Sequence, residues 1–455
     1  MPTSHDTEGQ TGDGGRRGGA MGGGTAPLRL GTLDRWLAAL AARQPRGDLE
    51  MVAALLAAAL AFAAFPIVTV VRGEPGMDYG LWFATARAYL AGGEIYPGDG
   101  RAFDFIYPPS AAAMLAGASA FGSIGFVVVL TLLNTAAWVA CASLTVWLVT
   151  GRARGQHPVL TLLPTLGVVF WIWDTYLLGQ PALLLLALVL GAAALLRSGR
   201  PALAGALVGT AAAIKAYPAL VLPYLVYRRR WKAAAAAAAA LVVWLIALPL
   251  LLRPPRMVVS DLVTWTRGVA LSYGESSIAQ RSLRAYSYRN QSIFGVTGRL
   301  LRAIPADAEA DTEWTVNVAR LSFPASNALL ATAVAGLLLL FVLALPRGRP
   351  QAPLPEALEW GALLLLVAMV SPLSFNYSFA WMLFPLGAAA GAMVEAPPGS
   401  PRRRRWAWVL GASLGVQALA LPFRRGAQAY GNVFFSALIL FVALALELRA
   451  RRRAA

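Results

Sequence analysis

One carboxylate, Asp78, lies shortly after the first strongly apolar segment of the chain, residues 51–71. The stretch before it, residues 73–76, is rich in glycine and proline, and residues 79–91 have the pattern of a helix lying on a surface. A carboxylate at the mouth of a cleft can act as a general base by accepting a proton from a hydroxyl. An aspartate at a helix start also caps free backbone N–H groups. The two roles are compatible, so the sequence leaves both open.

Polar residues interrupt the apolar sequence at three further places. Tyr107 precedes two consecutive prolines, which is also the pattern of an ordinary boundary between a loop and a helix. Gln180 lies in a tight hairpin, where it could bind a sugar hydroxyl or satisfy the backbone of two helix ends. Lys215 separates the apolar segments 201–214 and 216–227. A lysine there either extends its ammonium to water or pairs with an anion, for which a lipid phosphate is a good candidate.

Two more polar breaks lie farther along the chain, at Asn290-Gln291-Ser292 and at Ser371–Tyr377, which contains Asn376. Residues 253–325 are also unusually basic. This suggests an anionic ligand, although a solvated surface or one resting on anionic headgroups would have the same composition. The arginines of this stretch are Arg253, Arg256, Arg267, Arg281, Arg284, Arg289, Arg299, Arg302 and Arg320.

The overall composition identifies the class of protein that must position these residues. Of 455 residues, 58% are hydrophobic and only 13% are charged, and the mean hydropathy is +0.60. Soluble domains carry about 25% charged residues, so this is a polytopic membrane protein. The net charge of +17 resides in short runs between apolar segments, which argues against nucleic acid as a partner. With one cysteine and two histidines, a disulfide framework and a Cys- or His-based metal site are not expected.

A spanning helix needs about 20 apolar residues, and twelve segments of the chain approach this length. Three of them, 181–196, 201–214 and 216–227, are short, as in helices that tilt, pair or line a cavity. The other nine predicted spans lie near 51–71, 123–149, 158–177, 233–252, 326–345, 357–371, 377–394, 406–422 and 432–448. The sequence therefore predicts an all-α polytopic membrane protein with about twelve transmembrane helices and short surface helices in its outer loops.

Lysine and arginine runs predict the orientation of these spans. If twelve spans alternate, the short basic loops and both termini fall on one side, the cytoplasm. Two long loops, 72–122 and 253–325, then face outward, and the polar breaks share that outer face. We therefore expect the active site on the outer side of the cell membrane.

The two ends of the chain differ in composition from the part between them. Residues 1–49 are predicted to form a disordered cytoplasmic tail with an amphipathic helix near 28–43 on the membrane surface. Residues 50–448 are the predicted transmembrane catalytic domain, and 449–455 are a predicted basic cytoplasmic tail.

The order of the polar breaks resembles glycosyltransferase family 87. The resemblance runs from about residue 51 to 445. Each motif is short, so the order and the topology of the motifs carry the specificity. They are Asp78, Tyr107-Pro108-Pro109, Gly179-Gln180, Lys215-Ala216-Tyr217-Pro218, Asn290-Gln291-Ser292 and Ser371-Pro372-Leu373-Ser374.

This resemblance implies a GT-C fold and the activity of the polyprenol-phosphate-mannose-dependent mannosyltransferases of bacterial envelopes. It implies an outward active site, inversion at the anomeric carbon, and Asp78 as the general base. One departure concerns the histidine that family members often carry just after the Ser-Pro-x-Ser motif. Here the corresponding residues are Asn376, Tyr377 and Ser378. The departure makes the identity of the acceptor, and that of the sugar, open questions.

Transfer of a sugar from a lipid phosphate requires a base, a stabilised leaving phosphate and a cleft. Asp78 is the predicted base. Lys215, Arg289 and Arg284 are predicted to bind the donor phosphate. The scheme requires no metal or cofactor, and the predicted partners are a polyprenyl-phosphate-sugar donor, a glycolipid or polysaccharide acceptor and membrane lipids. The predicted sugar- or acceptor-binding residues are Tyr107, Gln180, Asn290, Gln291, Asn376 and Tyr377.

Three other classes of protein fit parts of the same pattern. A transporter or lipid flippase would also have twelve spans and short helix pairs, although the sequence has no clear inverted repeat and almost no midplane charge. An envelope polymer polymerase or ligase would use a similar donor and a similar basic loop. In a non-catalytic scaffold, Asp78 would be only a helix cap.

Overall fold

The computed structural model describes residues 32, 34, 35, 37–39, 47–74, 76–97, 104–152, 157–307, 314–348 and 352–454. Within these residues the chain is almost entirely helical. Its one sheet there is a short antiparallel hairpin in which Ser277 pairs with Ser282 and Ile278 pairs with Arg281. The predicted all-α class is therefore confirmed.

Eight of the described helices are long and apolar enough to cross a membrane. They are α2 (Gly47–Val71), α5 (Gly122–Thr150), α6 (Val159–Leu178), the continuous run α10–η2–α11 (Trp231–Val242, Val243–Ala247, Leu248–Leu252), α14 (Phe323–Ala344), α15 (Pro353–Val370), η5–α16 (Asn376–Met382, Leu383–Glu395) and α19 (Asn432–Ala454).

Shorter or bent elements account for the remaining predicted spans. Helices α17 (Pro401–Ala418) and α18 (Ala420–Ala429) form a pair bent by 84° that qualifies as one broken span. The three segments predicted to be short are short apolar helices: α7 (Ala182–Arg197), α8 (Pro201–Ile214) and η1–α9 (Tyr217–Leu220, Val221–Tyr227). Each of the twelve predicted segments therefore has a helical counterpart, but only eight of the described helices, or nine with the bent pair, are long and apolar enough to cross a membrane.

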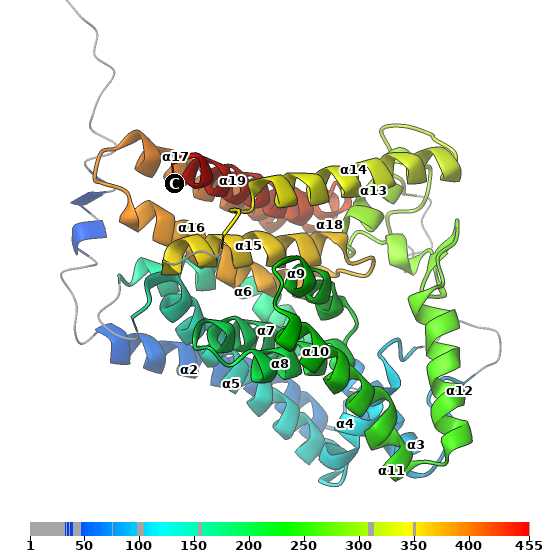
Figure 1. Ribbon diagram of the computed structural model, residues 1–455. Helices are drawn as coiled ribbons and strands as arrows, with labels where there is room; N and C mark the ends of the chain where they lie inside the picture. Colours follow the sequence, from blue (N-terminus) through cyan, green and yellow to red (C-terminus); the bar gives the residue numbers. More distant parts are fainter. Residues whose placement is uncertain are drawn as a thin grey trace, which may run out of the picture.

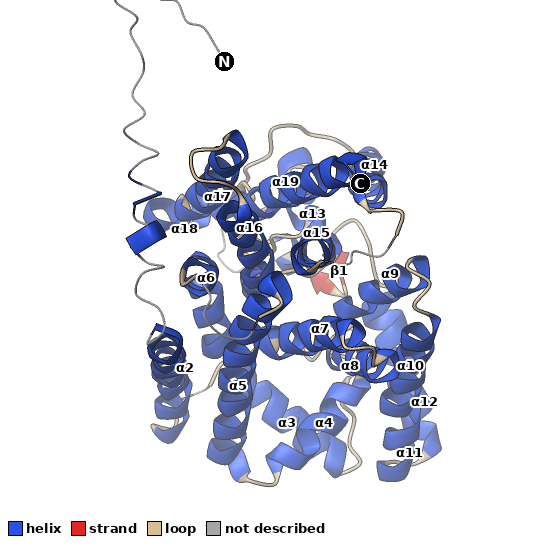
Figure 2. Ribbon diagram, turned by 60° about the vertical axis from the view of Figure 1, so that its left-hand side comes forward, coloured by secondary structure: helices blue, strands red, loops and turns tan. Residues whose placement is uncertain are grey.

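The spans differ in how much of their surface the protein itself covers. Helix η5–α16 is 94% buried along its apolar window and α15 is 78% buried, whereas the corresponding values for α10–α11 and α14 are 11% and 17%. An apolar helix buried on all sides belongs to the core, and one exposed on most sides faces lipid. Figure 2 shows α15 in the interior of the molecule, next to α16 and α19.

Small residues allow α8 and α10 to approach each other closely. A β-carbon at Gly205 would collide with the carbonyl oxygen of Ala233, and one at Gly209 would collide with that of Ala237. This spacing of small residues four positions apart is typical of close helix contacts in membranes. It holds α8, whose C-terminus carries Lys215, against the lipid-facing α10.

Short elements at one end of the bundle form an outer layer. They are α3 (Asp78–Leu90), α4 (Pro109–Ser119), α12 (Pro255–Trp265), η3 (Thr266–Ala270), β1 (Ser277–Ile278), β2 (Arg281–Ser282), η4 (Arg284–Tyr286) and α13 (Ile293–Leu301). The predicted surface helix at 79–91 corresponds to α3. Figure 1 shows α12 running across the direction of α14 and α15, as expected of a helix that caps the bundle rather than spanning it.

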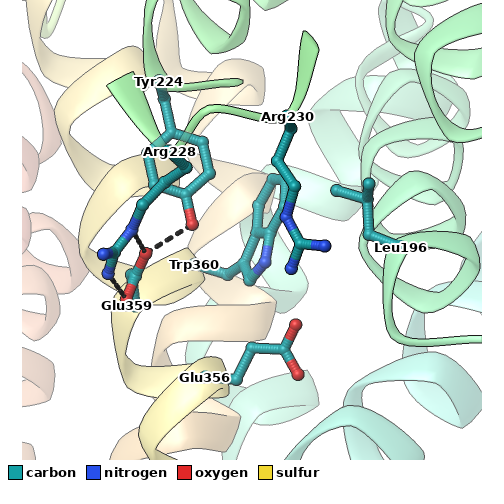
Figure 3. Close-up of a pocket in the computed structure, with 7 residues that line it drawn as sticks. All are labelled: Leu196, Tyr224, Arg228, Arg230, Glu356, Glu359 and Trp360. Atoms are coloured by element: carbon teal, nitrogen blue, oxygen red, sulfur yellow. Dashed lines mark hydrogen bonds and ion pairs between the residues drawn. The ribbon is translucent and has the colours of Figure 1, made fainter. Parts of the chain in front are cut away.

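Ion pairs join helices at the other end of α15, and Figure 3 shows the one between Arg228 and Glu359. Arg228 Nε lies 2.6 Å from Glu359 Oε1, and Tyr224 donates a hydrogen bond of 2.5 Å to the same oxygen. Arg197 pairs with Glu356 at 2.8 Å. Removing one partner of a buried pair leaves the other charge uncompensated, so these contacts lock α7 and α9 to α15.

The structure describes little of the predicted N-terminal tail and most of the predicted C-terminal tail. Most of the predicted tail 1–49, with its helix near 28–43, lies outside the described residues. Among those described, Leu37 is buried and Asp34 pairs with Arg403 at 3.0 Å. The predicted tail 449–455 is helical as far as Ala454, where α19 ends. Within it, Arg451 bonds to Glu447 at 3.0 Å, so intrahelical pairing extends the helix beyond its apolar part.

Candidate active site

Asp78 is the first residue of α3, and its carboxylate contacts a distant part of the chain. Gln180 Nε2 donates a hydrogen bond of 2.5 Å to Asp78 Oδ2. The N-cap of α3 is Met77, which has a positive φ of 48°, so Asp78 does not hold the capping position considered for it. Its carboxylate therefore interacts with another side chain rather than with the N-cap backbone.

Gln180 connects the carboxylate to a cation and a phenol. Its Oε1 accepts hydrogen bonds from the Tyr107 hydroxyl at 2.6 Å and from Lys215 Nζ at 3.2 Å. Its amide nitrogen is directed at Asp78. Both ends of this amide are thus engaged by side chains, and the amide orients the carboxylate and the ammonium relative to each other.

A tight turn between α6 and α7 holds Gln180 in place. Gly179 adopts φ 73°, and a β-carbon there would approach the Tyr79 ring to 2.9 Å, so this turn requires glycine. The Gln180 backbone N–H donates to Thr175 O at 2.9 Å, and its carbonyl accepts a bond from Asn134 Nδ2 at 3.2 Å. With its backbone satisfied in this way, the side chain of Gln180 is free to act on other side chains.

Lys215 ends α8 in an extended conformation, and aromatic rings surround its ammonium. Nζ lies 4.9 Å from the centroid of the Tyr107 ring and 4.7 Å from that of Tyr377. It also donates hydrogen bonds to the Tyr377 hydroxyl at 3.2 Å and to the Tyr107 hydroxyl at 3.4 Å. The rings replace part of the lost hydration of the cation without neutralising its charge.

The charged groups of this site alter each other's protonation. Burial raises the pKa of Asp78 above its usual value, and the Gln180 hydrogen bond and the charges of Arg281 and Lys215 oppose this shift. Burial lowers the pKa of Lys215 to about 7, and the Asp78 carboxylate opposes the shift while Arg281 adds to it. An acid and a base whose values move toward neutrality are typical of functional sites.

The five residues that meet here come from five separate elements, and all five are predicted site residues. We call them the reaction cluster: Asp78, Tyr107, Gln180, Lys215 and Tyr377. The helical bundle brings α3, the segment before α4, the α6–α7 turn, the α8–η1 junction and η5 to one place.

An apolar groove opens beside the reaction cluster, and we call it the α4–α5 groove. It has a volume of about 330 Å³ between α4, α5 and α7, and its walls include Met114, Leu115, Leu130 and Leu133. Tyr107 lines this groove as well as belonging to the cluster. The groove thus leads from an apolar surface to the charged groups, which suits an amphiphile with an apolar tail and a polar head.

Residues 105–372 match the model of glycosyltransferase family 87. The chain belongs to glycosyltransferase family 87. No curated protein and no solved structure matches it. Family membership and the apolar helices together identify a multi-pass membrane glycosyltransferase, and they argue against the transporter and the scaffold.

The family match covers three members of the reaction cluster: Tyr107, Gln180 and Lys215. Asp78 precedes the matched residues and Tyr377 follows them. The hydrogen bond from Gln180 joins Asp78 to the matched part of this glycosyltransferase, and the hydrogen bond from Lys215 does the same for Tyr377. The tertiary structure therefore connects the matched and the unmatched residues in one site.

A second set of polar residues, which we call the loop clamp, consists of Asn290, Gln291, Ser292 and Arg299. These side chains are fully buried and donate to backbone carbonyls. Asn290 Nδ2 bonds to Ala285 O at 2.6 Å and Pro372 O at 2.9 Å, and Gln291 Nε2 bonds to Tyr288 O at 2.6 Å and Gln428 O at 2.7 Å. The structure gives Asn290 and Gln291 a bracing role. Their predicted contact with a sugar stays a prediction.

Asn376 lies at the edge of the loop clamp, next to Tyr377. Its backbone N–H donates to Arg289 O at 3.2 Å, and Asn290 and Phe375 form an isolated antiparallel bridge beside it. The amide of Asn376 is buried, and its Oδ1 has no hydrogen-bond partner among the described residues. The predicted sugar contact of Asn376 stays a prediction.

The predicted phosphate-binding arginines lie on the η4 side of the loop. Arg284 is exposed at the start of η4. The Arg289 guanidinium lies over the Tyr288 ring, 5.6 Å from its centroid, and its charge reaches Asp174. The role of both arginines toward a donor phosphate stays a prediction.

Arg281 is the functional candidate that sequence reasoning did not single out from the nine arginines of its loop. It lies on β2 and donates a hydrogen bond of 3.2 Å to Asp104 O, and its charge acts on Asp78, Lys215, Tyr107 and Tyr377. Ala279 and Gln280, which join β1 to β2, both have positive φ, so a tight hairpin directs this arginine. Nothing in the local sequence marks Arg281 beyond its charge.

Proposed function

We propose that this glycosyltransferase moves a hexose, mannose in the first instance, from a polyprenyl phosphate to a hydroxyl of an envelope glycolipid or polysaccharide. The reaction takes place at the outer face of the cell membrane and inverts the anomeric carbon. The observation that carries the proposal is the Asp78–Gln180–Lys215 arrangement at the end of an apolar groove. It combines a base, a cation and a path for an apolar tail.

Asp78 acts as the general base. The acceptor oxygen forms a bond to the anomeric carbon while the bond from that carbon to the phosphate oxygen breaks. The acceptor proton passes to the Asp78 carboxylate, and the displaced polyprenyl phosphate keeps the electron pair. Because burial raises the pKa of this carboxyl, its ionised form is a stronger base than an exposed aspartate.

Lys215 and Arg281 stabilise the leaving phosphate. Negative charge develops on the phosphate oxygen as the glycosidic bond breaks, and fixed cations at that point lower the barrier. A phosphate beside Lys215 would favour the charged form of the lysine and raise its pKa from about 7. Donor binding would therefore complete the protonation of the cation that the reaction needs.

The α4–α5 groove receives the polyprenyl chain. Its walls are apolar, and the Tyr107 ring lies where the groove meets the ammonium of Lys215. A chain in the groove would put the attached phosphate beside Lys215 and the sugar near Asp78. The arginine-rich runs around Arg228 and Arg451 belong to the opposite helix ends, which supports an outward-facing cluster and cytoplasmic termini.

A transfer assay with matched variants tests the proposal. Purified protein in nanodiscs would receive radiolabelled polyprenyl-phosphate-mannose and an envelope lipid extract. We expect Asp78→Asn to lower the transfer rate by about 10²–10⁴-fold, the usual contribution of a general base. Glu94→Gln is the matched control, because Glu94 is an exposed acid of the same outer loop.

The assay separates the parts of the proposal. Both variants should keep the melting temperature and the elution volume of the wild type. Transfer by Asp78→Asn at the wild-type rate would remove Asp78 as the base. If the wild type transfers none of the label, the sugar or the donor class is wrong, and the same assay with other polyprenyl-phosphate sugars is the next test.

A further inference from the structure

A second groove lies between α6 and the bent pair α17–α18, and we call it the α6–α17 groove. It has a volume of about 630 Å³, against about 330 Å³ for the α4–α5 groove. Its walls include Leu166, Phe170 and Leu421, which are 66%, 57% and 65% exposed. Since both helices belong to candidate spans, this groove opens toward lipid rather than water.

One end of the α6–α17 groove is polar. Asp174 and Arg424 line it and face each other at 3.5 Å. Gln417 and Gln428 line it too. This end therefore combines a carboxylate, a guanidinium and two amides, and the charge of Arg289 also acts on Asp174.

The two amides are not saturated by the protein. Gln417 Oε1 accepts a hydrogen bond of 2.8 Å from Trp171 Nε1, but its Nε2 has no partner among the described residues. Gln428 is fully buried, and neither terminal atom of its side chain has a partner there. Leaving buried polar atoms unpaired destabilises the protein, so a hydroxyl-bearing molecule at this end would supply missing partners.

The polar end lies close to the reaction cluster in the fold. Asp174 precedes Tyr176, whose carbonyl accepts the hydrogen bond of the Tyr79 hydroxyl at 2.9 Å, and Tyr79 follows Asp78. Asp174 also comes six residues before Gln180, which is about 9 Å of helix rise. A headgroup of a few sugar rings anchored at Asp174 could therefore reach Asp78.

We propose that the α6–α17 groove binds the membrane anchor of the acceptor, and that the acceptor is a glycolipid with a hydroxyl-rich headgroup. This inference rests on the proposed function. Transfer between two lipid-linked molecules needs two separate grooves leading to one site. The larger groove suits an anchor bulkier than a single polyprenyl chain, and the unpaired amides at its polar end suit hydroxyls, which both donate and accept hydrogen bonds.

Photolabelling tests the binding site without requiring catalysis. The probe is a mannosyl diacylglycerol with a diazirine in one acyl chain, presented in phosphatidylcholine nanodiscs. We expect labelled peptides from α6 and α17. Ala418→Trp places an indole in the groove and should lower this labelling by about ten-fold. Ala412→Trp is the matched control, since Ala412 is exposed on the same helix but does not line the groove.

A second readout connects the groove to the acceptor. Ala418→Trp should lower transfer to mannosyl diacylglycerol while leaving hydrolysis of the donor by water at the wild-type rate. Asp174→Asn should raise the KM for this acceptor by about ten-fold, the effect of losing a hydrogen bond to a charged group.

The outcomes are distinguishable. Labelling that Ala418→Trp leaves unchanged, or that unlabelled phosphatidylglycerol displaces as well as unlabelled mannosyl diacylglycerol does, would overturn the glycolipid site. Groove labelling that behaves as expected, with no sugar transfer by the wild type, would contradict the proposed function and leave the glycolipid site standing.

Discussion

The reaction cluster, which is partly buried, and the loop clamp, which is fully buried, are both sets of polar side chains, but they use their hydrogen bonds differently. In the reaction cluster, Gln180 bonds to the side chains of Asp78, Tyr107 and Lys215. In the loop clamp, Asn290 and Gln291 bond to backbone carbonyls. A side chain bound to the backbone holds a fold in place, whereas side chains bound to one another can exchange partners with a substrate.

The cations of the two sets, Arg299 and Lys215, differ in the same way. The Arg299 guanidinium donates to the carbonyls of five residues, Ala429, Tyr286, Ser287, Asn290 and Gln428. Lys215 donates to an amide oxygen and two phenols and faces a carboxylate across Gln180. Arginine has five donors in a rigid fork and suits the first task, and lysine is a point charge that titrates readily and suits the second.

The largest expected effects come from removing each cation. Lys215→Met should lower the transfer rate by about 10²-fold, because a preorganised charge at the leaving group is lost, and should leave the melting temperature unchanged. Arg299→Met should instead lower the melting temperature strongly, because several buried carbonyls lose their donor. Thermal unfolding followed by tryptophan fluorescence, together with the transfer assay, measures both. If Arg299→Met keeps the wild-type melting temperature and loses only activity, Arg299 does not have the structural role that distinguishes it from Lys215.

The pH dependence of transfer separates the role of Asp78 from that of Lys215. Transfer needs Asp78 ionised, so kcat/KM should rise with pH through the raised pKa of Asp78. It also needs Lys215 protonated, so kcat/KM should fall as the pH rises through about 7. In Lys215→Arg the cation stays charged, so the remaining activity should not decline near pH 7. A decline at the same pH in this variant would exclude Lys215 as its cause.

The smallest effect concerns the α4–α5 groove. Leu133→Trp should raise the KM for a long-chain polyprenyl donor by about five-fold, because the indole occupies part of the groove. Leu132→Trp, at an exposed neighbouring position that does not line the groove, should have no effect. A donor with only two isoprene units should be used equally by both variants. Equal inhibition of both donors by Leu133→Trp would place the polyprenyl chain elsewhere.

Local sequence was enough to find most of the reaction cluster. Asp78, Gln180 and Lys215 stand out because a polar group among apolar membrane residues costs free energy and is therefore usually functional. Tyr107 and Tyr377 were found next to proline- and serine-rich breaks. The same reasoning also selected Asn290 and Gln291, since a residue that braces a loop and one that binds a ligand interrupt an apolar sequence alike.

Long-range pairing explains what sequence reasoning could not resolve. The carbonyls that engage Asn290 and Gln291 include Pro372 and Gln428, more than 80 residues away, so their bracing role was invisible locally. Arg281 was one of nine arginines, and only the β1–β2 hairpin directs its charge toward the reaction cluster.

The sequence by itself determined the all-α membrane architecture, the positions of the twelve apolar segments and the identity of the cluster residues. This is so because a bilayer requires each span to satisfy its own backbone hydrogen bonds, which makes apolar composition along the chain a direct guide to helices. Only the tertiary structure decided which polar residues face one another, which brace the backbone and where the two grooves open. Those features depend on contacts between helices far apart in the chain, for which local composition carries no signal.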